Sequence, residues 1–105
     1  MSIYIVSFRI ADQISNFGAY SDRWSSVNGA IQALAEGRNY WQETTSFFSL
    51  ESSFENSSQL ANAINMNSNF DPGMDLLLVI NLSRKGYTVL GDNGDADIDA
   101  IMSLR

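Results

Sequence analysis

The sequence of 105 residues contains no cysteine and no histidine. Without a thiolate or an imidazole, the chain cannot form a Ser-His-Asp triad, a Cys-His nucleophile pair, a disulfide or an ordinary zinc site. A large share of common enzyme chemistry is thereby excluded. We expect no cofactor, no metal ligand and no catalytic residue in this chain.

Long apolar runs are absent as well. The longest runs are far shorter than the about 18 residues that cross a bilayer, and the N-terminus lacks the basic segment, apolar stretch and cleavage site of a secretory signal. We therefore expect a cytoplasmic protein without membrane contact. The length of 105 residues and an apolar fraction of 45% suit a single domain with one core, spanning residues 1–105.

Basic residues are scarce, since six lysines and arginines stand against twelve acidic residues and leave a net charge of −6. This balance repels a phosphate backbone, so we expect weak or absent nucleic-acid binding. The acids gather near the C-terminus at Asp92, Asp95, Asp97 and Asp99. They do not match a calcium loop, because the sixth position counted from Asp95 is Ala100 where such a loop needs glycine. A solvated turn and helix start is favoured, with an incidental cation site as the alternative.

Strand and helix patterns follow one another clearly along the chain. Apolar runs at about Ile3 to Ile10 and at Leu76 to Leu82 predict two central strands. Asn56, Ser57 and Ser58 offer side-chain oxygens that can cap a short second helix. The residues expected on the buried faces of the two helices are Tyr20, Trp24, Val27, Ile31 and Leu34 in the first, ended by Gly37, and Leu60, Ala61 and Ile64 in the second. Gly29, inside the first helix, suggests close packing or a late helix start.

The segment from Asn39 to Ser53 is rich in aromatic and β-branched residues. It predicts two short strands with a turn near residues 44–46, although one long bent strand fits equally well. A hairpin turn at residues 84–86 then leads into a small edge strand at Tyr87 to Leu90, and residues 95–104 suit a terminal helix. The whole order predicts an α+β fold, a ferredoxin-like β-α-β-β-α-β sandwich with an extra C-terminal edge strand and a short terminal helix.

Several residues suggest chemistry, but each has a simpler structural interpretation. The carboxylate pairs Glu43 with Glu51 and Asp71 with Asp75 could hold magnesium or act as acid and base, although exposed strands and loops often carry such residues. Lys85 is expected to be an exposed turn residue. The aromatic residues Tyr40, Trp41, Phe47, Phe48 and Phe54 could stack on RNA bases, but a core role is favoured because the acidic chain gives no electrostatic help.

A set of mostly hydrophobic motifs resembles a known family. The motifs are Tyr40-Trp41-Gln42-Glu43-Thr44-Thr45-Ser46-Phe47-Phe48, a short capped helix, Asp75-Leu76-Leu77-Leu78-Val79-Ile80, then Gly86-Tyr87 and Gly91. Together, over residues 2 to 91, they resemble the small bacterial SinR-family proteins, which are distinct from the helix-turn-helix repressor. That family looks related to the ferredoxin-fold CRISPR-associated endoribonuclease that is the dimeric structural subunit of the spacer-integration complex. The resemblance implies a ferredoxin-like fold and a homodimer.

The same resemblance implies no catalytic residue. In the nuclease branch of the family an aspartate proposed as metal ligand ends the first strand, whereas Phe8, Arg9 and Ile10 stand at those positions here. Arg9 cannot bind a cation, but it could contact phosphate or pair with Asp12 or Glu43. The nearest acid, Asp12, is displaced by three residues.

The sequence therefore favours a non-enzymatic, homodimeric interaction or scaffold protein, with a further protein partner left open. We expect the dimer to form through the sheet or its edge, with Tyr87, Val89 and Leu90 contributing. Two alternatives remain at this stage. One is a metal-dependent nuclease or toxin with a displaced carboxylate site at Asp12, and the other is a small-molecule-binding regulatory domain.

Overall fold

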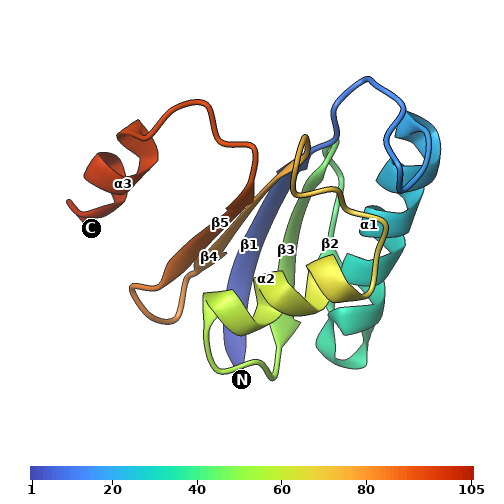
Figure 1. The fold of residues 1–105 in the computed structure, drawn as a ribbon. Helices are drawn as coiled ribbons and strands as arrows, with labels where there is room; N and C mark the ends of the chain where they lie inside the picture. Colours follow the sequence, from blue (N-terminus) through green and yellow to red (C-terminus); the bar gives the residue numbers. More distant parts are fainter.

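The computed structural model describes all 105 residues as one α+β unit with an antiparallel sheet and three α-helices (Figure 1). In chain order the elements are β1 (Ser2–Arg9), α1 (Tyr20–Leu34), the 3-10 turn η1 (Glu36–Arg38), β2 (Tyr40–Trp41), β3 (Phe47–Ser52), α2 (Ser57–Met66), β4 (Leu76–Asn81), β5 (Tyr87–Gly91) and α3 (Asp97–Met102). None of the helices is both long and apolar enough to cross a lipid bilayer.

The five strands lie in the order β2-β3-β1-β4-β5, and every neighbouring pair is antiparallel. The strand β1 is central, because Val6 lies opposite Phe48 of β3 on one side and Val79 of β4 on the other. The two strands that the sequence marks as most apolar are therefore direct neighbours. The strands β2 and β5 form the two edges of the sheet.

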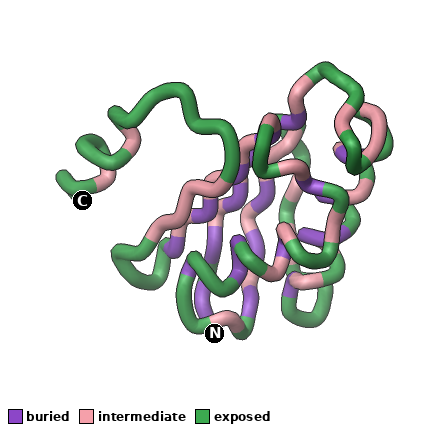
Figure 2. The backbone as a smooth tube through the Cα atoms, viewed as in Figure 1, coloured by how far each residue is buried: buried purple, intermediate pink, exposed green.

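Both long helices cover the same face of the sheet, while the opposite face carries no helix (Figure 1). We call these the helix-covered face and the open face. Side chains alternate along β1, so Tyr4, Val6 and Phe8 point into the core. Figure 2 shows this core as buried segments concentrated in the sheet and the inward sides of α1 and α2.

The helix α1 confirms the predicted helical spacing with one exception. Val27 and Ile31 are fully buried, and Trp24 and Leu34 pack against the core from partly exposed positions. Tyr20 was expected on the same face but is 41% exposed, and it is the first residue of the helix. The pattern missed two buried residues of α1, Ala30 and Arg23, and Arg23 is completely buried.

The segment between α1 and α2 forms two strands, so the single bent strand is wrong. The strand β2 is only two residues long, and Ser46 takes a positive φ of 56° at the turn before β3. Gly37 does adopt the left-handed conformation with φ 59°, although it belongs to η1 rather than to the end of α1. Both suggestions for Gly29 are wrong, since α1 already begins at Tyr20 and no atom outside the local helix backbone lies within 4 Å of the Cβ position of Gly29.

The helix α2 begins as predicted, because the Asn56 side chain accepts a hydrogen bond from the Gln59 N–H at 2.9 Å. Its inward residues Leu60, Ala61 and Ile64 are fully buried. The terminal helix α3 forms where the sequence predicts it, but it buries no residue. Figure 1 shows α3 beyond β5, away from the layer of α1 and α2.

Candidate functional site

The most highly connected polar group is a buried ion pair between Arg23 of α1 and Asp75, the residue just before β4. Both side chains have 0% exposure. The five N–H groups of a guanidinium all find acceptors here. They donate to Asp75 Oδ2 at 3.1 Å, Asp75 Oδ1 at 3.1 Å, Ala11 O at 2.9 Å, Gln13 O at 2.8 Å and Gly18 O at 2.7 Å.

The carboxylate of Asp75 is equally saturated. Besides Arg23, it accepts the backbone N–H of Ala11 at 2.9 Å and that of Asp71 at 2.9 Å. Burial acts to raise the pKa of Asp75, but the hydrogen bonds from Arg23, Ala11 and Asp71 outweigh it and hold that pKa below its ordinary value. The hydrogen bond to Asp75 raises the pKa of Arg23 further above its ordinary value. The pair therefore remains charged and joins the β1–α1 loop to the start of β4.

We call Arg23, Asp75 and the backbone groups that they bind the loop clamp. Its geometry corrects the suggestion that Asp71 and Asp75 could bind magnesium or act as acid and base. Asp75 has no free oxygen lone pair and no solvent access, and Asp71 uses its Oδ1 to accept the Gly73 N–H at 2.9 Å. The role of the loop clamp is structural.

The other sequence candidates do not come together into a catalytic or metal-binding group. No three Asp or Glu side chains lie close enough together to hold a metal ion. Asp12 is exposed in the β1–α1 loop, and Glu43 is exposed between β2 and β3. Glu51 accepts a hydrogen bond from Asn39 at 3.3 Å, and Lys85 is an exposed turn residue as predicted.

Arg9 contacts neither acid that was considered for it. Its Nη2 donates to the backbone carbonyl oxygen of Asp92 at 2.9 Å, which links the end of β1 to the segment after β5. The C-terminal aspartates are used locally. Asp95 accepts the Asp97 N–H at 2.8 Å, and Asp99 accepts the Tyr87 hydroxyl, a hydrogen bond that raises the pKa of Tyr87 above its ordinary value.

The aromatic set divides between the two faces of the sheet. Tyr40 and Phe48 pack edge to face on the helix-covered side, with ring centroids 5.8 Å apart, and Phe54 also packs against the core. Trp41 and Phe47 form a second edge-to-face pair, at 6.3 Å, on the open face. Two aromatic residues in mutual contact do not form the row of stacking positions that an RNA-binding sheet presents.

The open face is mostly apolar over three of its five strands, β1, β4 and β5. The register places these side chains there in neighbouring positions: Ile3 and Ile5 of β1, Leu76, Leu78 and Ile80 of β4, and Tyr87 and Val89 of β5. Leu82 continues this surface and is 57% exposed. Of the predicted interface residues, Tyr87 and Val89 thus lie on the open face, whereas Leu90 packs against the core on the helix-covered side.

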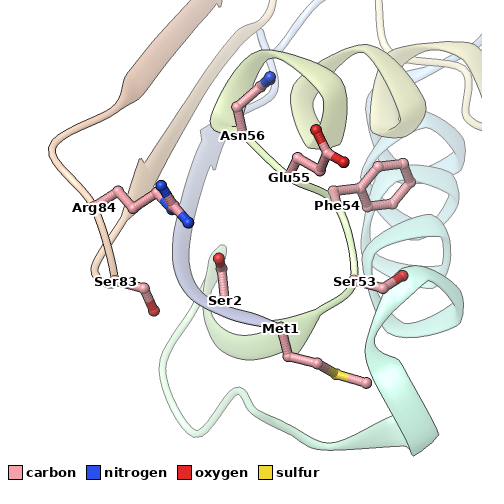
Figure 3. Close-up of a pocket in the computed structure, with 8 residues that line it drawn as sticks. All are labelled: Met1, Ser2, Ser53, Phe54, Glu55, Asn56, Ser83 and Arg84. Atoms are coloured by element: carbon pink, nitrogen blue, oxygen red, sulfur yellow. The ribbon is translucent and has the colours of Figure 1, made fainter.

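A cavity of about 750 Å³ lies at the end of the sheet where β1 begins (Figure 3). Figure 3 shows the Arg84 guanidinium reaching into it, with Glu55 and Asn56 at the start of α2 on the opposite side. Several of its polar groups already bind the chain, since Asn56 caps α2 and Ser83 Oγ accepts the Ile3 N–H at 3.0 Å. The cavity holds no pairing of a nucleophile with a base.

Comparisons with protein-family models, with curated proteins and with solved structures find no match to this chain.

Proposed function

We propose that this protein is a non-enzymatic, homodimeric interaction or scaffold protein. The observation that carries the proposal is the open face, where apolar side chains of three adjacent strands are covered by no helix. Apolar patches of this continuity commonly mark contact surfaces of proteins. The two buried charged side chains, Arg23 and Asp75, in contrast make their hydrogen bonds within the loop clamp, so neither is free to react.

The apolar part of the open face is large enough for a small contact with a second copy of the chain. Three strands spaced about 4.8 Å apart and about six residues long give an area of roughly 14 Å by 20 Å, or about 280 Å² in projection. Two copies then offer about 560 Å² in projection and more in accessible area, which belongs to the small interfaces below about 1,200 Å². A symmetric pair also covers the same patch on both partners.

We further propose that the fold is ferredoxin-like. The order β2-β3-β1-β4 with antiparallel neighbours, and both long helices on one face, supports this assignment. The strand β5 and the helix α3 are then additions to it at the β4 side. The relation to the SinR family is proposed on the sequence motifs alone.

The two alternatives have weaker support from the arrangement of residues. A nuclease would need carboxylates placed around a cation, and Asp12 stands on an exposed loop without two acidic partners. A small-molecule regulator would use the cavity in Figure 3, which presents Arg84 and Glu55, of opposite charge, to the same space.

Light scattering after size-exclusion chromatography tests the proposal at micromolar concentration. We expect a mass of twice the protomer's 11.6 kDa. Leu78→Lys should shift the protein to the monomer, because it places a charge in the middle of the open face. Met66→Lys is the matched control, since Met66 is 83% exposed on α2 and lies on the other side of the molecule. A wild-type protein that remains a monomer would contradict the proposal.

A further inference from the structure

The strand β5 is an edge strand whose outward backbone groups are available for pairing. The Asn81 N–H donates to Gly86 O at 2.9 Å, and the Asp92 N–H donates to Asp75 O at 2.8 Å. Because backbone groups in an antiparallel pair point alternately toward and away from the neighbouring strand, these two bonds show that Thr88 and Leu90 direct their backbone groups to β4. The backbone N–H and C=O groups of Tyr87 and Val89 point away from the sheet, and no loop or side chain binds them.

Nothing in β5 protects this edge against pairing. Natural edge strands are usually guarded by charged side chains, proline or a bulge. The strand Tyr87–Gly91 has the sequence Tyr-Thr-Val-Leu-Gly, with no charge and no proline, and it pairs with β4 in continuous register. Its edge is therefore suited to accept another strand.

The pattern is also self-complementary. The outward groups lie at positions 87, 89 and 91, so an antiparallel pairing centred on Val89 places Tyr87 opposite Gly91 of a second copy. Val89 then pairs with Val89 of the second copy across a two-fold axis, and Tyr87 pairs with Gly91, whose carbonyl oxygen also accepts the Asn93 N–H of its own chain at 3.1 Å. A two-fold axis of this kind closes the assembly at two copies, as most soluble homo-oligomers do.

The position of α3 fits the same arrangement. Figure 1 shows this helix beyond β5, and Tyr87, whose side chain lies on the open face, donates its hydroxyl hydrogen to Asp99 of α3. Arg105 also donates to the carbonyl oxygen of Gly86 at 3.1 Å, which ties the end of the chain to the β4–β5 turn. A helix of six residues gains little stability from its own hydrogen bonds, and Ile101 on it is 61% exposed.

From these observations we propose that two copies join through their β5 edges, with α3 of each copy lying on the open face of the other. This inference rests on the proposed homodimer and names the contact that forms it. The joined sheet has ten strands, because each copy contributes five. The helix α3, which projects past β5 in one copy, then lies over Leu78 and Val89 of the next and covers part of the apolar surface.

Amide hydrogen exchange on the wild-type protein tests the strand pairing without any substitution. The amides of Tyr87 and Val89 should exchange slowly at concentrations where the dimer forms and at least about tenfold faster on dilution to the monomer. The amides of Thr88 and Leu90 are the internal control, since β4 protects them in both states. Fast exchange at Val89 in a confirmed dimer would overturn the edge pairing while leaving the homodimer intact.

A spin label at Ser7→Cys gives an independent distance, and the chain has no other cysteine to be labelled. Ser7 lies level with Leu78 and hence with Val89, so five strand spacings separate the two copies, about 24 Å. Stacking of the two open faces would instead bring the labels to about 10 Å, the usual separation of packed sheets. The shorter distance would overturn the inference, and absence of any dimer would overturn the proposed function as well.

The role of α3 has its own matched test. Ile101→Ser should weaken dimerisation at least about tenfold without changing the unfolding of the monomer, because Ile101 is largely exposed in the single protomer. Met66→Ser removes an apolar side chain of comparable exposure from α2 and should leave the dimer affinity unchanged. Equal affinities of the two variants would overturn the placement of α3 on the partner.

Discussion

Arg23 and Asp75 connect three parts of the chain that lie far apart in the sequence. The guanidinium binds the β1–α1 loop at three carbonyl oxygens, and the carboxylate binds the turn before β4. A buried ion pair contributes little net stability over an apolar pair of the same shape, but removal of one partner leaves an uncompensated charge. The importance of each residue therefore depends on the presence of the other.

We predict that Arg23→Met and Asp75→Leu each lower the free energy of unfolding by about 3–5 kcal/mol. The double variant should lose less than the sum of the two, since it leaves no unpaired buried charge. Arg38→Met is the control, because Arg38 is exposed and the change should stay within about 0.5 kcal/mol. Urea unfolding measures all four differences, and an additive double variant would contradict the interpretation of the pair as a unit.

The loop clamp also predicts a pH dependence of stability. The pKa of Asp75 is lower in the folded protein than its ordinary value of 3.8, so the folded state favours the ionised form. Its contribution is present above the ordinary pKa and is lost as the pH falls below 3.8 and through the lower folded pKa. Asp75→Asn should reduce the slope of stability against pH in this acidic range, measured by urea unfolding at successive pH values. An unchanged slope would contradict the assigned shift.

At the level of the elements, two glycines have opposite roles. In α1, Gly29 has open space at its Cβ position, whereas at the end of β5 Gly91 has φ 106° and a Cβ there would overlap the carbonyl oxygen of Asp75. The first glycine costs the helix stability, and the second allows β5 to lie against β4. The same residue type is thus a weakness in one element and a requirement in the other.

We predict that Gly29→Ala raises the free energy of unfolding by about 0.5–1 kcal/mol, through better helix propensity. Gly91→Ala should lower it by more than about 1 kcal/mol, because the backbone conformation disfavours a side chain and the chain must shift away from Asp75. Thermal unfolding of the two variants gives the sign of each change. A stabilising Gly91→Ala would show that the close approach to β4 is not required.

The elements themselves were largely predictable. Regular apolar spacing located β1, α1, α2 and β4, since these elements bury one side against the core and must repeat with their own period. The split of residues 39–53 into β2 and β3 was left open by the sequence, because aromatic and β-branched residues favour extended backbone on both sides of a turn. The turn is made by Ser46 with a positive φ, and because this residue is not glycine, the sequence does not indicate the turn conformation.

At the level of the whole molecule, the acidic surface sets the expected partners. The net charge of −6 disfavours a phosphate backbone at long range, and Arg9, a basic residue on the open face, already binds the Asp92 carbonyl oxygen. The apolar contact that we propose with a second copy does not depend on such charge. The surface therefore suits protein association better than nucleic-acid binding.

We predict no submicromolar binding of DNA or RNA at about 150 mM salt. We also expect no cleavage of labelled single-stranded or double-stranded DNA or RNA in magnesium or manganese, since Asp12 lacks the neighbouring carboxylates that would place a cation. Fluorescence anisotropy measures the binding, and gel analysis measures the cleavage. Cleavage that disappears in Asp12→Ala would instead support the nuclease with a displaced site.

The candidate site was less predictable than the fold. Asp75 was singled out from the sequence as a potential catalytic or magnesium-binding acid, and the loop clamp shows the opposite role. No sequence pattern indicates that Arg23 is buried, because a charged residue within an apolar helical pattern is normally expected on the solvent side. Its partner Asp75 is 52 residues away in the sequence, so no local sequence pattern connects the two residues.

The sequence by itself determined the type and order of the secondary structure outside residues 39–53 and the acidic net charge, because local spacing and composition are sufficient for both. Only the tertiary structure decided which apolar residues are covered. Ile5 and Val6 are neighbours in one apolar run, yet the pleat of β1 places Val6 in the core and Ile5 on the open face. The two long helices of this chain lie on one side of the sheet, and because the chain supplies no second layer, the other side carries no helix.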